Sequence, residues 1–127
     1  MTEARQSVSA AVDELPFCGD VVAPDGLRAL EPLLARCSMG LSVWRSGFDG
    51  SDILRGGGEE VEFEMDAGQG AVKFFSGSIQ AGSDAALRLL DELSDAFRRA
   101  GLRHRIEIDG ADGSRLGYLH HEWPQEA

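Results

Sequence analysis

The sequence predicts an α+β protein, a two-layer sandwich in which an antiparallel sheet of four to five strands, built from two β-hairpins, carries helices on one face. Three observations lead to this prediction. Apolar and polar residues alternate through residues 61–75 and again through 103–121, which is the period of half-buried strands. Between these segments, residues 82–102 repeat apolar side chains at helical spacing.

The N-terminal segment, residues 1–23, is weakly patterned. Val8, Ala11, Val12 and Leu15 recur at helical spacing, but Pro16 would end any helix there. This segment therefore adds no strand to the predicted sheet.

Residues 24–40 predict a helix whose apolar face carries Leu27, Leu30, Leu34 and Cys37. Pro32 interrupts the pattern, so we expect a kink. Residues 41–46 follow as a short strand. Residues 46–60 hold five glycines without a period, which is typical of a loop.

The first hairpin is predicted to turn at Gly68-Gln69. That turn sets a register in which apolar residues oppose apolar residues and acids oppose bases. The predicted pairs are Met65 with Val72, Phe63 with Phe74, and Glu64 with Lys73.

The helix of residues 82–102 is the clearest element. Its apolar stripe ends at Gly101, which is typical of a Schellman C-terminus. The stripe is Ala86, Leu90, Leu93, Phe97 and Ala100, with Leu87 and Leu89 at its margins.

The second hairpin is predicted to turn at Asp112-Gly113, so that the numbers of paired residues sum to 225. This register turns Ile106 and Leu119 toward the helix and opposes His104 to His121. It also opposes Leu102 to Trp123, as a cap on the core. Arg105, Tyr118 and His120 fall on the other side, as a polar recognition surface with Tyr118 as its exposed aromatic anchor.

Composition limits the class of protein. The 127 residues, 43% of them apolar, predict a single globular domain without a membrane-spanning run. No secretory signal is recognisable, so we expect the cytoplasm, with Cys18 and Cys37 as free thiols.

The formal net charge is −10, and all of it lies in residues 1–95, because residues 96–127 hold five acids and five bases. Such a field repels nucleic acids and anionic membranes and attracts a basic protein. Much of this charge lies in one row, Glu59, Glu60, Glu62, Glu64 and Asp66, which is either a solvated face or a docking face for a basic partner.

Two alternatives remain for the histidines. Opposed on neighbouring strands, His104 and His121 are close enough to share a metal ion, although zinc needs three or four ligands and no spacing points to a third. The other interpretation is a partly buried pair packed at the end of the hairpin. No nucleophile is placed beside either histidine, and the sequence predicts no cofactor.

Small size, acidity, an α+β fold and the lack of a catalytic constellation form a profile similar to that of bacterial toxin-neutralising (immunity) proteins and small secretion chaperones. This resemblance is one of overall type and rests on no motif. It implies a non-enzymatic inhibitor or chaperone that docks a basic toxin or effector. The competing hypotheses are a metal-binding domain or small enzyme that uses His104, His121 and a cysteine, and a homodimer that pairs through an exposed strand edge.

Overall fold

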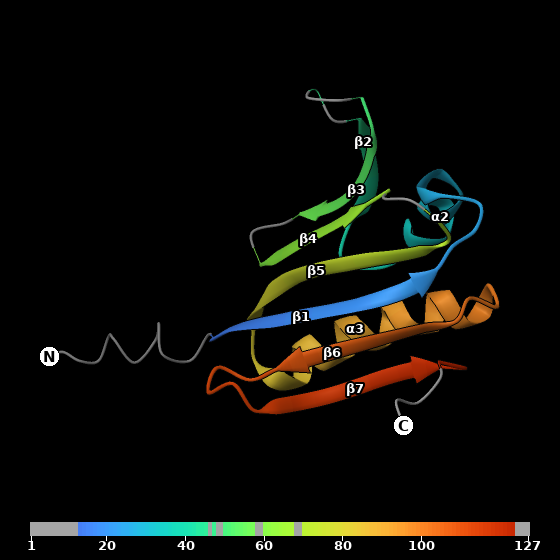
Figure 1. The fold of residues 1–127 in the computed structure, drawn as a ribbon. Coiled ribbons are helices and arrows are strands. Elements are labelled where there is room, and N and C mark those ends of the chain that lie inside the picture. The colour runs from blue at the N-terminus through green and yellow to red at the C-terminus, as the bar shows by residue number, and fades with distance from the viewer. Residues whose placement is uncertain (1–12, 46, 48–49, 58–59, 68–69, 124–127) are drawn as a thin grey trace, which may run out of the picture.

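The computed structural model describes residues 13–45, 47, 50–57, 60–67 and 70–123 (Figure 1). Its fold is α+β, as predicted, but the sheet has seven strands instead of four to five. The elements run in this order: β1 (Asp13–Val22), α2 (Leu27–Leu34), β2 (Leu41–Arg45), β3 (Asp52–Gly57), β4 (Val61–Asp66), β5 (Val72–Ala81), α3 (Ser83–Arg99), β6 (His104–Asp109) and β7 (Arg115–His121).

All neighbouring strands are antiparallel, in the order β2-β3-β4-β5-β1-β6-β7. Figure 1 shows β1, in blue, between β5 and β6. The N-terminal strand therefore joins the two predicted hairpins, a role that its weak pattern did not indicate. Val8, Ala11 and Val12 lie outside the described residues, whereas Leu15 and Pro16 belong to β1 instead of a helix.

The second unpredicted strand is β3, which lies within the segment predicted to be a loop. It pairs with β2 and β4 on its two sides, and Leu54 is completely buried. Arg28 on α2 anchors its start, because the guanidinium donates to both carboxylate oxygens of Asp52 at 3.1 Å.

Both helices pack on one side of the sheet, which we call the covered face. α2 contacts β2 and β3, α3 contacts β1, β5, β6 and β7, and the two helices contact each other. α2 is shorter than predicted: it ends at Leu34, and Cys37 N–H donates to the Leu34 carbonyl in the turn that follows. Pro32 lies inside this helix, where it cannot donate a backbone hydrogen bond.

The end of α3 confirms the prediction. Gly101 has φ 75°, its N–H donates to the Arg98 carbonyl, and Leu102 N–H donates to the Phe97 carbonyl, which is a Schellman motif. The predicted stripe is buried through Phe97, but Ala100 is exposed.

Four phenylalanine rings form the centre of the core. Phe75 contacts Phe63, Phe17 and Phe97, with ring centroids 5.4, 6.5 and 6.1 Å apart. Glycines in neighbouring strands make room for these rings: a Cβ on Gly77 would lie 2.8 Å from the Phe17 ring and 1.9 Å from the Glu62 carbonyl oxygen. The strand glycines are therefore packing positions.

The first hairpin does not have the predicted register. Met65 opposes Phe75, Phe63 opposes Gly77 and Glu64 opposes Ser76, three positions further along β5 than expected. An odd shift moves every side chain of a strand to the other face. Phe74 is consequently 56% exposed, while Phe75 is fully buried.

The same shift turns Lys73 onto the covered face, where it does not oppose Glu64. Its ammonium donates to the carbonyls of Ala67, at 2.5 Å, and Gly70, at 2.7 Å, in the connection between β4 and β5. These two hydrogen bonds satisfy a charge that is only 7% exposed.

The second hairpin has the predicted register from His104↔His121 to Ile108↔Gly117, and a bulge follows at Asp109. Ile106 is buried and Leu119 half-buried against the helix, as predicted. No helix in the described part of the chain has the length and apolar character that crossing a membrane requires.

Candidate functional site

The side of the sheet opposite the helices, which we call the open face, has no element packed on it in the described part of the chain. It presents every second side chain of each strand. These side chains include Trp44, Arg55, Glu62, Glu64, Asp66, Phe74, Ser76, Cys18, Asp20, Arg105, Glu107, Tyr118 and His120.

The acidic row, defined as Glu60, Glu62, Glu64 and Asp66, is exposed along its whole length. Among the described residues, Glu62, Glu64 and Asp66 have neither an ion pair nor a side-chain hydrogen bond. Glu59, which was predicted to extend the row, lies outside the described residues. The row is thus a line of carboxylates that form no ion pair, although Arg55 on β3 faces Glu64.

A shallow depression of about 510 Å³ lies beside this row. Glu62, Glu64, Arg55 and Ser76 contribute the polar groups of its lining. Arg55 and Ser76 stand directly opposite Glu64, on β3 and β5 respectively. The depression is open to solvent and accessible to a side chain of a partner.

Exposed aromatic rings flank the acidic row. Trp44 on β2 is 60% exposed, and Phe74 on β5, the strand next to the row, is 56% exposed. Exposed rings of this size beside charged groups are typical of binding surfaces. The sequence did not predict Phe74 here, because the predicted register placed it in the core.

The predicted recognition surface of Arg105, Tyr118 and His120 lies on the same open face, but β5 and β1 separate it from the acidic row. At the usual spacing of strands, this places the two groups about 14 Å apart. They are therefore two clusters and do not form a single site.

Arg105 is the centre of the second cluster and is already paired. Asp20 accepts from its Nε at 2.9 Å and lies 2.8 Å from its Nη2, and Glu107 contacts its Nη1. Although partial burial lowers the pKa of Arg105, the carboxylates of Asp20 and Glu107 raise it by more. Asp20 and Glu107 neutralise the charge of Arg105 and hold its side chain in place. Arg105 therefore attracts a distant anion only weakly.

The Tyr118 and His120 rings lie beside this network, tilted by 32° to each other with centroids 5.1 Å apart. Arg115 lies over the Tyr118 ring at 5.6 Å, and Arg105 lies over the Trp123 ring at 5.9 Å. Trp123 was predicted to oppose Leu102 as a cap on the core. Instead the chain turns at Glu122, whose φ is 52°, and the indole meets Arg105.

His104 is a buried structural residue. It is 0% exposed, its Nδ1–H donates to the Leu102 carbonyl at 2.9 Å, and its Nε2 accepts from the Ser94 hydroxyl at 2.7 Å. Burial lowers its pKa, since a charged imidazole is poorly solvated there, and the nearby charge of His121 acts in the same direction. Both ring nitrogens are occupied, so His104 has none left for a metal ion.

The arrangement does not favour the metal hypothesis. His104 and His121 do stack as predicted, with ring centroids 6.0 Å apart. However, the described residues include no group of three or more His, Cys, Asp or Glu side chains that could hold a metal ion.

The contact between Ser94 and His104 has the chemistry of a nucleophile and its base, and the sequence analysis missed it. The helical spacing that places Ser94 beside the apolar stripe was its only signal. Both residues are buried, so a substrate cannot reach the hydroxyl.

Neither cysteine is activated. Burial, followed by the charge of Glu107, raises the pKa of the Cys18 thiol. Burial, together with Glu92, raises the pKa of Cys37 to about 11. The reactive thiolate is therefore scarce at neutral pH in both cases.

Comparison with known proteins finds no family model, no curated protein and no solved structure that matches this chain.

Proposed function

We propose that this protein is a non-enzymatic binding module that docks a basic protein partner on the acidic row of its open face. The observation that carries the proposal is the lack of ion pairs in the row: Glu62, Glu64 and Asp66 form none among the described residues. We assign the protein to the type of the immunity proteins, inhibitors and small secretion chaperones. Its free cysteines are in keeping with a reducing compartment, and we place the interaction in the cytoplasm.

Electrostatics supports this choice of partner. Carboxylates two residues apart on a strand are about 7 Å apart and repel each other by roughly 0.6 kcal/mol in water. A lysine or arginine side chain of a partner, placed between Glu62 and Glu64, is attracted by both carboxylates. These two attractions outweigh the repulsion between the carboxylates. The net charge of −10 adds a long-range field that speeds the encounter with a basic protein.

The shape of the surface supports a protein partner. The depression lies between β3, β4 and β5 and is open to solvent, so a long side chain of a partner protein can enter it. Trp44 and Phe74 provide the apolar contacts on either side that an interface needs around its charged groups.

The test uses labelled peptides of equal length that are rich in Lys and Arg, neutral, or rich in Asp and Glu. Fluorescence anisotropy and stopped-flow mixing measure their binding at low and high salt. We expect binding of the basic peptide alone, with an affinity that falls as salt rises.

The deciding variant is Glu62→Lys with Glu64→Lys. Its matched control is Asp25→Lys with Asp91→Lys, which changes the net charge equally but lies just before α2 and on α3. The proposal expects slower association of the basic peptide with the first variant, by about tenfold or more, and a much smaller change with the control. Equal losses in both variants would show that net charge alone attracts the peptide, and the proposed site would be wrong.

Sedimentation of the free protein at two concentrations checks whether a second copy covers the open face. A monomer is expected. A stable dimer whose formation requires Trp44 or Phe74 would favour the homodimer hypothesis and contradict the proposal.

A further inference from the structure

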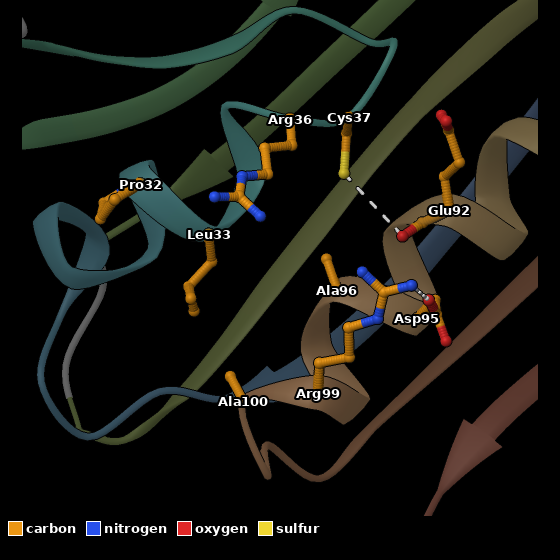
Figure 2. Close-up of a pocket in the computed structure, with 9 residues that line it drawn as sticks. All are labelled: Pro32, Leu33, Arg36, Cys37, Glu92, Asp95, Ala96, Arg99 and Ala100. Atoms are coloured by element: carbon orange, nitrogen blue, oxygen red, sulfur yellow. Dashed lines mark hydrogen bonds and ion pairs between the residues drawn. The ribbon is translucent and has the colours of Figure 1, made fainter.

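A groove runs along the seam between α2 and α3, on the side of the molecule away from the open face. It consists of two shallow cavities, of about 450 and 160 Å³, both lined by Leu33 and Ala100. Figure 2 shows the Arg36 side chain lying along α2 with its guanidinium near Leu33, and Ala96 extending toward α2 from the opposite wall. We call this feature the helix groove.

Apolar side chains run along the helix groove between charged groups. Leu33 lies between the two cavities, Ala96 and Ala100 form the α3 wall of the larger cavity, and Leu30 and Leu102 line the smaller one. Ala96 and Ala100 are four residues apart, so their small side chains lie one above the other and leave room on one face of α3. Ala100 belongs to the predicted apolar stripe but lies in this open seam, where it is exposed.

Charged groups also line the larger cavity of the helix groove: Arg36, Glu92, Asp95 and Arg99. Both carboxylates there already have partners. Glu92 accepts from the Ser38 backbone N–H at 3.1 Å and from its hydroxyl at 3.2 Å. Asp95 pairs with Arg99 at 2.7 Å and also with Arg98.

Arg36 differs from these groups. Its guanidinium has neither an ion pair nor a hydrogen bond among the described residues, although it lies in the same cavity lining. A free guanidinium next to an apolar channel matches a ligand with one anionic group and an apolar tail. A dianion fits less well, since Glu92 and Asp95 lie nearby.

We propose that the helix groove is a binding site for a small monoanionic amphiphile, a carboxylate with an aliphatic tail. The carboxylate accepts two parallel hydrogen bonds from Arg36, the geometry in which arginine binds carboxylates best. The tail lies over Leu33 and Ala100 toward the smaller cavity. The larger cavity, of about 450 Å³, is in the range of small-molecule sites, and the smaller one, of about 160 Å³, extends it.

The test uses octanoate as the probe, with isothermal titration calorimetry and amide NMR shifts as readouts. Acetate carries the charge without the tail, and octyltrimethylammonium carries the tail with the opposite charge. We expect saturable binding of octanoate, with shifts in residues 29–37 and 96–102, and much weaker binding of the other two. Equal binding of the ammonium compound would overturn the proposal, because it would show that the charge of Arg36 plays no part.

Two variants separate the head from the tail. Arg36→Gln removes the charge and should weaken octanoate binding about tenfold or more, as expected for a lost charged hydrogen bond. The matched control is Arg88→Gln, an exposed arginine of α3 outside the helix groove, which should bind octanoate like the wild type. Ala96→Leu fills the groove without breaking the helix and should also weaken binding.

Unchanged octanoate affinity in both Arg36→Gln and Ala96→Leu would place the ligand elsewhere and refute the proposal. The result is independent of the acidic row, since neither variant alters the open face. Binding of the basic peptide and binding of octanoate can therefore succeed or fail separately.

Discussion

The covered and open faces of the sheet are formed by the same strands, but they differ in burial and in charge. In β4, Val61, Phe63 and Met65 are buried under the helices, whereas the alternate residues Glu62 and Glu64 are in water. On the covered face, glycines make room for phenylalanine rings. On the open face, Glu62 and Glu64 form no ion pair within the described protein.

The residues that stabilise the fold and the residues proposed to bind a partner therefore lie on opposite faces of the same sheet. Changes on the covered face should alter the free energy of unfolding, because they create cavities or clashes. Changes on the open face should alter binding and leave unfolding almost untouched. The four predictions below test this separation, from the largest expected effect to the smallest.

Adjacent phenylalanines give the sharpest test. Phe75→Ala removes a fully buried ring that contacts three others and should lower the free energy of unfolding by about 3–5 kcal/mol. Phe74→Ala, one residue away on the open face, should change it by less than about 0.5 kcal/mol. Urea denaturation measures both, and similar losses in the two variants would contradict the observed register of β5.

Gly77→Ala tests the close approach of backbone and ring on the covered face. The added methyl would lie 1.9 Å from the Glu62 carbonyl oxygen, so β4 and β5 must separate locally, at a cost of about 1–3 kcal/mol. Ser76→Ala on the open face is the control and should unfold like the wild type. If Gly77→Ala leaves the free energy of unfolding unchanged, the strands adjust freely at this point, and the prediction is wrong.

Acidification tests the buried histidine. Burial holds the pKa of His104 below its value of about 6.5 in the unfolded chain, so the unfolded state binds the proton more readily. His104 therefore contributes stability above about pH 6.5, and this contribution is lost as the pH falls toward the lowered folded pKa.

The measurement is the free energy of unfolding of wild type and His104→Gln between about pH 7.5 and 5.5. The variant should start less stable but lose less stability on acidification. His120→Gln on the open face is the control, and it should retain the part of the slope that His104 causes. Parallel pH curves for wild type and His104→Gln would contradict this account.

Charge reversal on the open face should have the smallest effect on folding. Glu62→Lys with Glu64→Lys replaces one like-charged pair by another and puts a cation opposite the exposed Arg55, at a cost of about 1 kcal/mol or less. The thermal midpoint should therefore stay close to that of the wild type, while association with the basic peptide slows. Thermal unfolding followed by circular dichroism measures the first effect. A large drop in the midpoint would show that these carboxylates stabilise the fold. It would contradict the claim that the open face contributes little to stability.

The two hairpins show what a local sequence pattern can predict. The register of β6 and β7 was predicted correctly because a short turn with Gly113 at φ 88° constrains it and because single apolar residues alternate on both strands. In β5 the sequence Lys73-Phe74-Phe75 fits either orientation of the strand. Two adjacent phenylalanines point to opposite faces, so the alternation does not show which of them is buried. Contact of Phe75 with Phe63 and Phe97 decides which ring is buried.

The missed strands and sites share a physical cause. β1 pairs with β5 and β6, which are far away in the chain, and β3 is stabilised by its pairing with two neighbours instead of by a pattern of its own. The acidic row was predicted because a strand period alone exposes it. Phe74, the buried Ser94–His104 contact and the helix groove were not, because each depends on elements that meet only in three dimensions.

The α+β class, the two helices, the register of the second hairpin and the exposed line of carboxylates can all be read from local patterns. Local periodicity and turn chemistry act over a few residues, and these are sufficient for such features. Long-range packing, in contrast, sets the place of β1 between the hairpins, the choice of Phe75 over Phe74 for the core, and the unpaired Arg36 in the lining of the helix groove. These outcomes depend on which distant surfaces exclude water from each other, and no short stretch of the chain contains that information.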